Sequence, residues 1–205
     1  MSIELQPAQL RAIKSYVLSS QDHLLPDESM ANIEVSTTGL TFSLNGILRA
    51  QLQLTNNSKA LVDRIDECFT DHKIGEEQIV YRVCNYREMM KTLRDNNYID
   101  YGYMSTSKNI DDTQRFYQNA SFVYQPAFIT ITIPFDSEVI DLECIDGFEN
   151  DTYEGEILFK REALFTVLTD IELPTRGLED IMGREMTTLH DTLRVLELQF
   201  VRYLQ

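Results

Sequence analysis

Three short stretches of the sequence carry side chains whose types and spacing could do chemistry. In the first, Glu154 and Glu156 stand two residues apart, at the start of an apolar run that ends at Phe159. Residues i and i+2 of an extended backbone project from the same face, so this spacing predicts two carboxylates side by side at the mouth of a buried strand. Such a pair suits sugar or acid-base chemistry. Paired glutamates on solvated strand ends are also common, so the pair needs partners elsewhere in the chain.

The second stretch places an arginine inside an apolar strand. Residues 79–84, Ile-Val-Tyr-Arg-Val-Cys, have the composition of a strand, with Arg82 on the same face as Val80. A buried guanidinium needs partners because its desolvation is costly. One interpretation is a structural ion pair. The other is an anchor for phosphate or carboxylate, which the planar guanidinium fork suits best.

The third stretch is a run of hydroxyl residues. Ser105, Thr106 and Ser107 end a β-like segment that we predict over residues 98–107. Their hydroxyl groups could satisfy strand-end backbone groups, or they could orient a ligand and catalytic side chains by hydrogen bonding. Neither serine stands in a Gly-x-Ser-x-Gly motif, so the sequence gives no support for a serine nucleophile.

The elements that must position these residues change character along the chain. Hydrophobic periodicity predicts helices over 7–18, 44–52 and 58–69, with Ser43 and Ser58 as candidate N-caps. Later segments are mostly β-like, and we predict strands over 79–84, 98–107, 128–133, 139–142, 154–159, 163–171 and 193–203, with short helices over 85–94 and 113–120. We expect a single domain over residues 1–205, mainly helical over 1–75 and β-rich over 76–205.

Composition excludes some classes of function. The apolar content of 43% and charged content of 25% are ordinary for a globular protein, but the net charge is -15. This charge argues against binding nucleic acid through its phosphates, and against docking to anionic lipid. The three cysteines lack metal-ligand spacing, and we expect no disulfide framework. With no signal peptide and no transmembrane segment, we expect a soluble protein.

The three stretches occur in the order arginine strand, Ser-Thr-Ser, Glu-x-Glu. This order resembles the signature of the mono-ADP-ribosyltransferases, in the branch that includes the C3-like and actin-modifying toxins. Residues 102–107, Gly-Tyr-Met-Ser-Thr-Ser, are close to the family's second motif. The basic pair Lys160-Arg161 matches the family's habit of placing a basic residue after the apolar triplet that follows the catalytic glutamate. The resemblance spans residues 58–172, with the last strand as a further member.

The resemblance implies an α+β fold, a mixed two-sheet β-sandwich around an NAD cleft with a helical N-terminal portion. It implies NAD as the substrate and no metal. Arg82 would bind the pyrophosphate of NAD, and the backbone of Val83, where the family commonly has glycine, would contact the nicotinamide amide. Ser105 would orient the catalytic glutamate, while Thr106 and Ser107 would shape the pocket.

The same resemblance assigns different roles to the two glutamates. Glu156 would accept a hydrogen bond from the nicotinamide-ribose 2'-hydroxyl and stabilise the oxocarbenium-like cation that forms there. Glu154 would engage the acceptor. A glutamate at this position resembles the arginine-modifying members, whereas asparagine-modifying members have glutamine there. The resemblance therefore predicts a target protein with an accessible arginine.

Aromatic residues near these motifs are candidates for ligand and target contacts. An aromatic residue after the hydroxyl run commonly stacks near nicotinamide in this family, and Phe116 is our candidate, with Tyr117 next. Phe148 and Tyr153 lie in the loop ahead of the glutamates, so we expect them to contact the target protein.

Three functions stay open at this stage. The first is transfer of ADP-ribose to a protein arginine, and the second is NAD hydrolysis with water as acceptor. The third is an inert interaction module of the same fold, whose mark would be a lost arginine, serine or glutamate; Arg82, Ser105 and Glu156 are all present. Because the chain shows no separate binding or translocation module, we expect an effector that is injected or internally expressed, by a route that uses no signal peptide.

Overall fold

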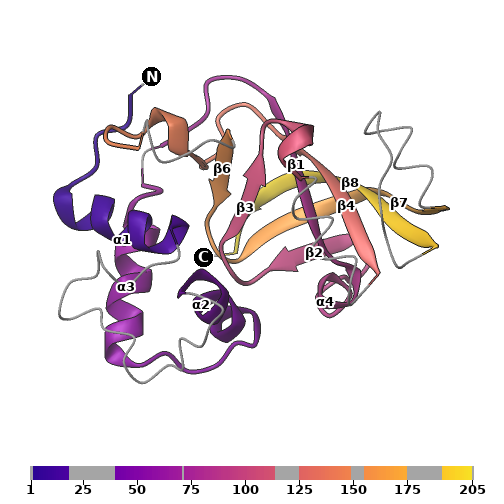
Figure 1. Cartoon of the computed structure of the whole chain (residues 1–205), viewed down its shortest axis with the longest axis horizontal. Coiled ribbons are helices and arrows are strands. Elements are labelled where there is room, and N and C mark those ends of the chain that lie inside the picture. The colour runs from indigo at the N-terminus through magenta and orange to yellow at the C-terminus, as the bar shows by residue number, and fades with distance from the viewer. Residues whose placement is uncertain are drawn as a thin grey trace.

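The fold is described from a computed structural model that covers residues 2–18, 40–70, 72–113, 125–148, 155–174 and 191–204. Three helices precede the first strand, and they lie together at one side of the molecule (Figure 1). Their bounds are Pro7–Val17 for α1, Leu40–Arg49 for α2 and Asn56–Glu67 for α3. The predicted helix over 113–120 falls almost wholly outside the described residues, and the segments 19–39 and 175–190 fall wholly outside them.

The helix ends follow local capping chemistry, and two predicted caps are wrong. α1 begins at Pro7, whose missing N–H costs nothing in the first turn. The cap of α3 is Thr55, whose hydroxyl accepts a hydrogen bond from the Ser58 N–H at 3.2 Å, so Ser58 lies inside the helix. Ser43 likewise lies inside α2, which ends before Leu52.

The strands form one eight-stranded mixed sheet in the described part of the chain, in the order β2-β7-β8-β4-β1-β3-β6-β5. Most pairs are antiparallel, and β4 with β8 is parallel. A short helix α4, Tyr86–Met89, follows β1, and the short 3-10 helices η2 and η3 span Ile110–Asp112 and Leu142–Cys144. The strand bounds are Gln78–Asn85 (β1), Asn97–Asp100 (β2), Met104–Ser107 (β3), Pro126–Ile133 (β4), Ile140–Asp141 (β5), Glu156–Phe159 (β6), Ala163–Pro174 (β7) and Thr192–Tyr203 (β8).

The sheet has two parts that meet at a narrow connection. β1 pairs with β4 along its whole length, but it pairs with β3 at a single position, Tyr81 opposite Ser107. Phe159 of β6 packs against Phe165 of β7 and Phe200 of β8, which are not its neighbours in the strand order, so the part formed by β3, β6 and β5 faces the part formed by the other five strands. The α+β class is confirmed, and the two sheets that we predicted are these two parts.

The predicted strand over 98–107 is two strands that lie in different parts of the sheet. β2 pairs with β7 at one end of the sheet, whereas β3 lies between β1 and β6. The turn at residues 101–103 carries the chain from one part to the other. Its Gly102 leaves no room for a side chain, because an added Cβ would lie 2.7 Å from the Asn45 Oδ1 atom.

The buried core explains why the helices pack against the part of the sheet formed by β3, β6 and β5. One buried cluster contains residues from all three N-terminal helices together with Tyr103, Ile140 and Leu158 of the strand region. A second cluster lies between the strands and includes Val80, Ile131 and Phe159. The helices therefore pack directly against the segments that lead into β3, β5 and β6, where two of the three predicted motifs lie.

Candidate active site

Strands β1, β3 and β6 are neighbours in the sheet, and they bring three predicted residues together. Arg82 of β1 donates a hydrogen bond from Nη1 to the backbone carbonyl of Ser105 on β3. Glu156 opens β6 directly opposite Ser107. Arg82, Ser105 and Glu156 are each half-buried, which leaves part of each side chain accessible to a small molecule.

The arginine lies where the two parts of the sheet separate. Past the single pair of Tyr81 with Ser107, the Arg82 guanidinium supplies the donor that the Ser105 carbonyl needs. This partner is a neutral oxygen, so the contact leaves the positive charge of the arginine uncompensated by it. A guanidinium has five N–H donors in a fixed fork. Because the Ser105 carbonyl uses one of them, the other donors can still bind an anion.

The hydroxyl run divides between two tasks. The Thr106 hydroxyl donates to the Ile157 carbonyl at 2.7 Å, which ties β3 to β6. The Ser107 hydroxyl donates to the Asn109 carbonyl at 2.9 Å and accepts from the Asn109 N–H at 2.9 Å. Both side chains are buried, whereas that of Ser105 is half-buried. Thr106 and Ser107 thus satisfy backbone groups at a strand end, and Ser105 remains the hydroxyl residue closest to the surface.

The backbone between the two glutamates is not extended. Gly155 has φ +52°, in the left-handed region, so the strand begins only at Glu156. The expectation of an extended backbone between the two glutamates is therefore wrong at Gly155. The Lys108 N–H donates to the Gly155 carbonyl at 2.9 Å, which fixes this bend to the end of β3. Glu154 and Tyr153 lie outside the described residues.

Lys108 forms a local charge cluster beside the bend. Its ammonium group contacts the Asp141 carboxylate at 3.0 Å and also binds Glu143. Burial acts to lower the pKa of Lys108, but the hydrogen bonds to Glu143 and Asp141 outweigh it and raise the pKa above its ordinary value. The lysine is therefore a cation that holds β5 and η3 against the end of β3.

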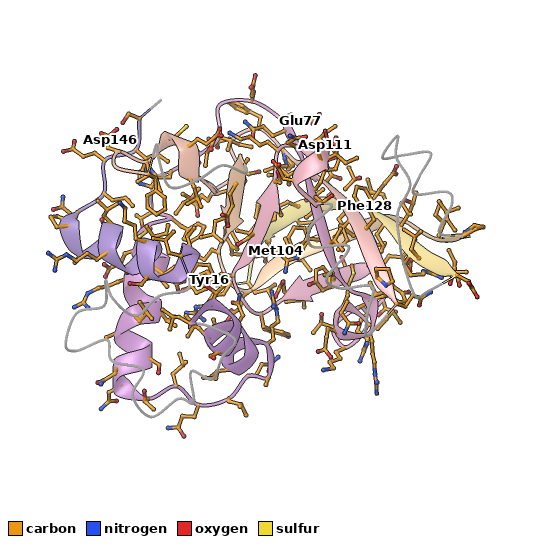
Figure 2. All side chains as sticks on the ribbon, in the orientation of Figure 1. Tyr16, Glu77, Met104, Asp111, Phe128 and Asp146 are labelled. Atoms are coloured by element: carbon orange, nitrogen blue, oxygen red, sulfur yellow. The ribbon has the colours of Figure 1, made fainter. Side chains whose placement is uncertain are left out.

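A buried phenol lies at the junction of helices and strands. Figure 2 labels Tyr16 of α1 and Met104, the first residue of β3, and the Tyr16 hydroxyl donates at 3.3 Å to the carbonyl of Tyr103, the residue before Met104. Burial raises the pKa of Tyr16 above its ordinary value, while the hydrogen bond from Asn45 lowers it. The charges of Arg49 and Arg82 also lower the pKa of this phenol, and the charge of Glu156 raises it.

One predicted aromatic contact is contradicted by the structure, and the candidates for another lie outside the described residues. Phe148 is wholly buried in the helix-side core, with the Lys14 ammonium 5.3 Å from its ring centre. In this packing its ring has no surface to offer a target protein, so that prediction is wrong. Phe116 and Tyr117 lie outside the described residues. The Val83 side chain is buried against Phe128, and its backbone is part of the β1–β4 ladder.

Comparison with known proteins identifies the family. Residues 23–190 match the family model described as ADP-ribosyltransferase exoenzyme. The chain belongs to the ADP-ribosyltransferase exoenzyme family. It is an ADP-ribosyltransferase, and its substrate is NAD. Among curated proteins, none matches the chain significantly.

Solved structures show the same fold at low sequence identity. The toxin Plx2a from Paenibacillus larvae superposes with a TM-score of 0.57 and 13% identity, over 98% of this chain and 99% of that chain. The enzymatic component C2-I of the Clostridium botulinum C2-toxin gives 0.61 and 12%, over 98% of this chain but 44% of its own. Exoenzyme S from Pseudomonas aeruginosa, solved with human 14-3-3 protein beta and Carba-NAD, gives 0.55 and 17%, over 93% and 86%.

The sequence interpretation missed a polar network between the helices and the strands of this transferase. Asn45 is a buried polar residue in the apolar stripe of α2, and Arg49 follows it at the i+4 spacing that places both on one helix face. Arg49 contacts Asp100 through two hydrogen bonds of 2.8 and 2.9 Å. The signal available in the sequence was an asparagine within the apolar stripe of this helix, one turn ahead of an arginine.

Neither a metal-ligand cluster nor a membrane-spanning helix occurs in the part of the chain that the structure describes. No group of three or more His, Cys, Asp and Glu side chains there could hold a metal ion. No helix in that same part of the chain is long and apolar enough to cross a membrane.

Proposed function

We propose that this chain is a mono-ADP-ribosyltransferase that modifies an arginine of a target protein and acts as a toxin or effector of the C3-like and actin-modifying branch. The observation that carries the proposal is the junction of β1, β3 and β6. It gathers a strand arginine, a half-buried serine and a half-buried glutamate from segments far apart in the sequence.

Each of these residues has a task in the first half of the reaction. Arg82 binds the pyrophosphate of NAD, and the Val83 backbone contacts the nicotinamide amide. The bond from the ribose C1' to the nicotinamide nitrogen then breaks, its electron pair leaves with neutral nicotinamide, and positive charge develops on the ribose. Glu156 stabilises this charge more in the transition state than in the ground state, and Ser105 orients Glu156.

The second half of the reaction uses an arginine of the target. A guanidinium is a poor nucleophile while protonated, and its pKa in water is above about 12. Glu154 orients the incoming guanidinium and takes its proton as the nitrogen bonds to the ribose C1'. Phe116 and Tyr153 remain proposed contacts for nicotinamide and the target, respectively.

Replacing the ribose-side glutamate tests the whole assignment. Glu156→Gln removes the charge that stabilises the ribose cation, so we expect nicotinamide release to fall at least about a thousandfold. The measurement is nicotinamide release from NAD, with circular dichroism and thermal unfolding to check the fold. Glu197→Gln, at an exposed position on β8, is the control and should release nicotinamide at the wild-type rate. Full activity in a folded Glu156→Gln protein would refute the catalytic role proposed for Glu156.

A second variant separates transfer from hydrolysis. Glu154→Gln should lose transfer to an arginine-rich protein while it retains part of the nicotinamide release with water as acceptor, because only the acceptor loses its base. Labelled NAD with arginine-rich or lysine-rich protein, followed by mass spectrometry of the modified residue, measures both activities. Equal loss of the two activities would remove the acceptor role from Glu154. Equal labelling of the two proteins would remove the arginine preference.

A further inference from the structure

Tyr103 is held by all three N-terminal helices, two residues ahead of Ser105. Its N–H donates to Oδ1 of Asn45 on α2 at 2.9 Å. Its carbonyl accepts from the Tyr16 hydroxyl of α1 at 3.3 Å and from Nη2 of Arg49 on α2 at 3.3 Å. Both polar groups of the Tyr103 backbone are thus fixed by side chains that come from the helical portion.

The side chain of Tyr103 is fixed by the third helix. Its hydroxyl lies 2.7 Å from Oδ1 of Asp66 and 3.1 Å from the Val62 carbonyl, both on α3. Its ring, which is wholly buried, packs edge-on against Tyr16 and stacks with Phe69. The start of β3 therefore has little freedom to move relative to the helices.

Asp66 holds β6 as well. Its Oδ2 atom accepts hydrogen bonds at 2.8 Å from Nε and Nη2 of Arg161, the second residue after β6. The Asp66 and Arg161 side chains are only 12% and 19% exposed, so bulk water screens this pair little. One carboxylate on α3 therefore fixes the strand that carries Ser105 and the strand that Glu156 opens.

We propose that Asp66, Tyr103 and Arg161 are positioning residues that hold β3 and β6 in the arrangement that catalysis needs. The inference rests on the proposed roles of Ser105 and Glu156. Arg82 donates to the Ser105 carbonyl on β3, but its own strand has a separate support, because β1 is paired along its length with β4. Loosening the network should therefore disturb the orientation of the serine and the glutamate while leaving the anchor for the NAD pyrophosphate in place.

A chemically matched network elsewhere in the protein supplies the control. Tyr86, Asp170 and Arg194 form a second Tyr–Asp–Arg set, in which Asp170 accepts from Tyr86 at 2.9 Å and from Arg194 at 2.8 Å. The Arg194 and Asp170 side chains are 20% and 21% exposed, close to the values of the first pair. This second set ties β7 to β8 and α4, and its three residues lie on neither β3 nor β6.

The experiment compares steady-state NAD cleavage in paired variants, well below their unfolding temperatures. Tyr103→Phe keeps the ring but removes the hydroxyl, and Arg161→Met removes the charge; their controls are Tyr86→Phe and Arg194→Met. We expect kcat for nicotinamide release to fall about tenfold to a hundredfold in the first two, with KM for NAD changed less than about threefold, because small displacements of reacting groups slow chemistry strongly. The controls should lose comparable thermal stability and keep the wild-type kcat.

A conservative variant and the wild type make the result unambiguous. Arg161→Lys keeps a cation near Asp66 and should recover part of the kcat that Arg161→Met loses. Unchanged kcat in folded Tyr103→Phe and Arg161→Met would overturn the positioning role, and so would equal losses of kcat in the control pair. A wild-type protein that releases no nicotinamide would instead refute the proposed function itself.

Discussion

Gly155 determines how the chain enters β6 at the level of the single residue. Its left-handed backbone turns the loop into the strand immediately before Glu156, and its carbonyl is held by the Lys108 N–H. Only glycine takes this conformation without strain from a Cβ atom. Here the Cβ atom would also lie 3.3 Å from Cε and 3.4 Å from Cβ of Lys108, the lysine that binds Asp141 and Glu143.

Gly155→Ala should therefore destabilise the protein and slow NAD cleavage. The left-handed conformation costs a non-glycine residue about 1–2 kcal/mol, and relief of that strain would shift Glu156. Urea unfolding and nicotinamide release measure the two effects. Gly75→Ala is the matched control, because an added Cβ there meets nothing within 4 Å, and we expect it to stay within about 0.5 kcal/mol of the wild type. Wild-type stability in Gly155→Ala would contradict the strain.

Some site residues could be identified from the sequence and others could not. Arg82 was identifiable because a charge interrupts an apolar strand, and Glu156 because it precedes a buried run. Tyr103 and Asp66 were not, since an aromatic residue beside a strand and an aspartate on a helix are ordinary until the fold brings them within 2.7 Å. Local pattern shows which residues are unusual, but it does not show which ordinary residues meet.

Elements with a strong pattern in their own residues were predicted best. The alternating residues of β4 and β8 gave strands whose bounds differ from the prediction by one or two positions. The segment 98–107 was predicted as one strand, because the turn inside it is stabilised from outside. There the Gly102 N–H donates to the Asp100 carboxylate at 3.0 Å, and Arg49 of α2 neutralises that carboxylate. The hydrophobic pattern of the segment itself cannot predict a contact with a helix some fifty positions earlier, so the turn was missed.

At the scale of the whole molecule, the helices and the strands act as one unit. We propose that residues 1–205 form a single domain, because helices α1 to α3 share a buried core with the segments around β3, β5 and β6. This core and the Tyr103 contacts give the helical portion a task inside the catalytic unit. The strand part alone, residues 76–205, would expose that shared core and lose every helix contact to Tyr103.

The net charge of -15 makes a prediction for the molecule as a whole. Excess like charge destabilises a compact state through self-repulsion. Raising ionic strength from about 0.01 M to about 0.15 M shortens the Debye length from about 30 Å to about 8 Å, which screens this repulsion. The less exposed ion pairs of Asp100 with Arg49 and Asp66 with Arg161 are screened much less. We therefore expect the unfolding temperature, followed by circular dichroism, to rise with salt. Sodium and potassium chloride at equal ionic strength should give equal shifts, and a falling unfolding temperature would show that exposed ion pairs outweigh the self-repulsion.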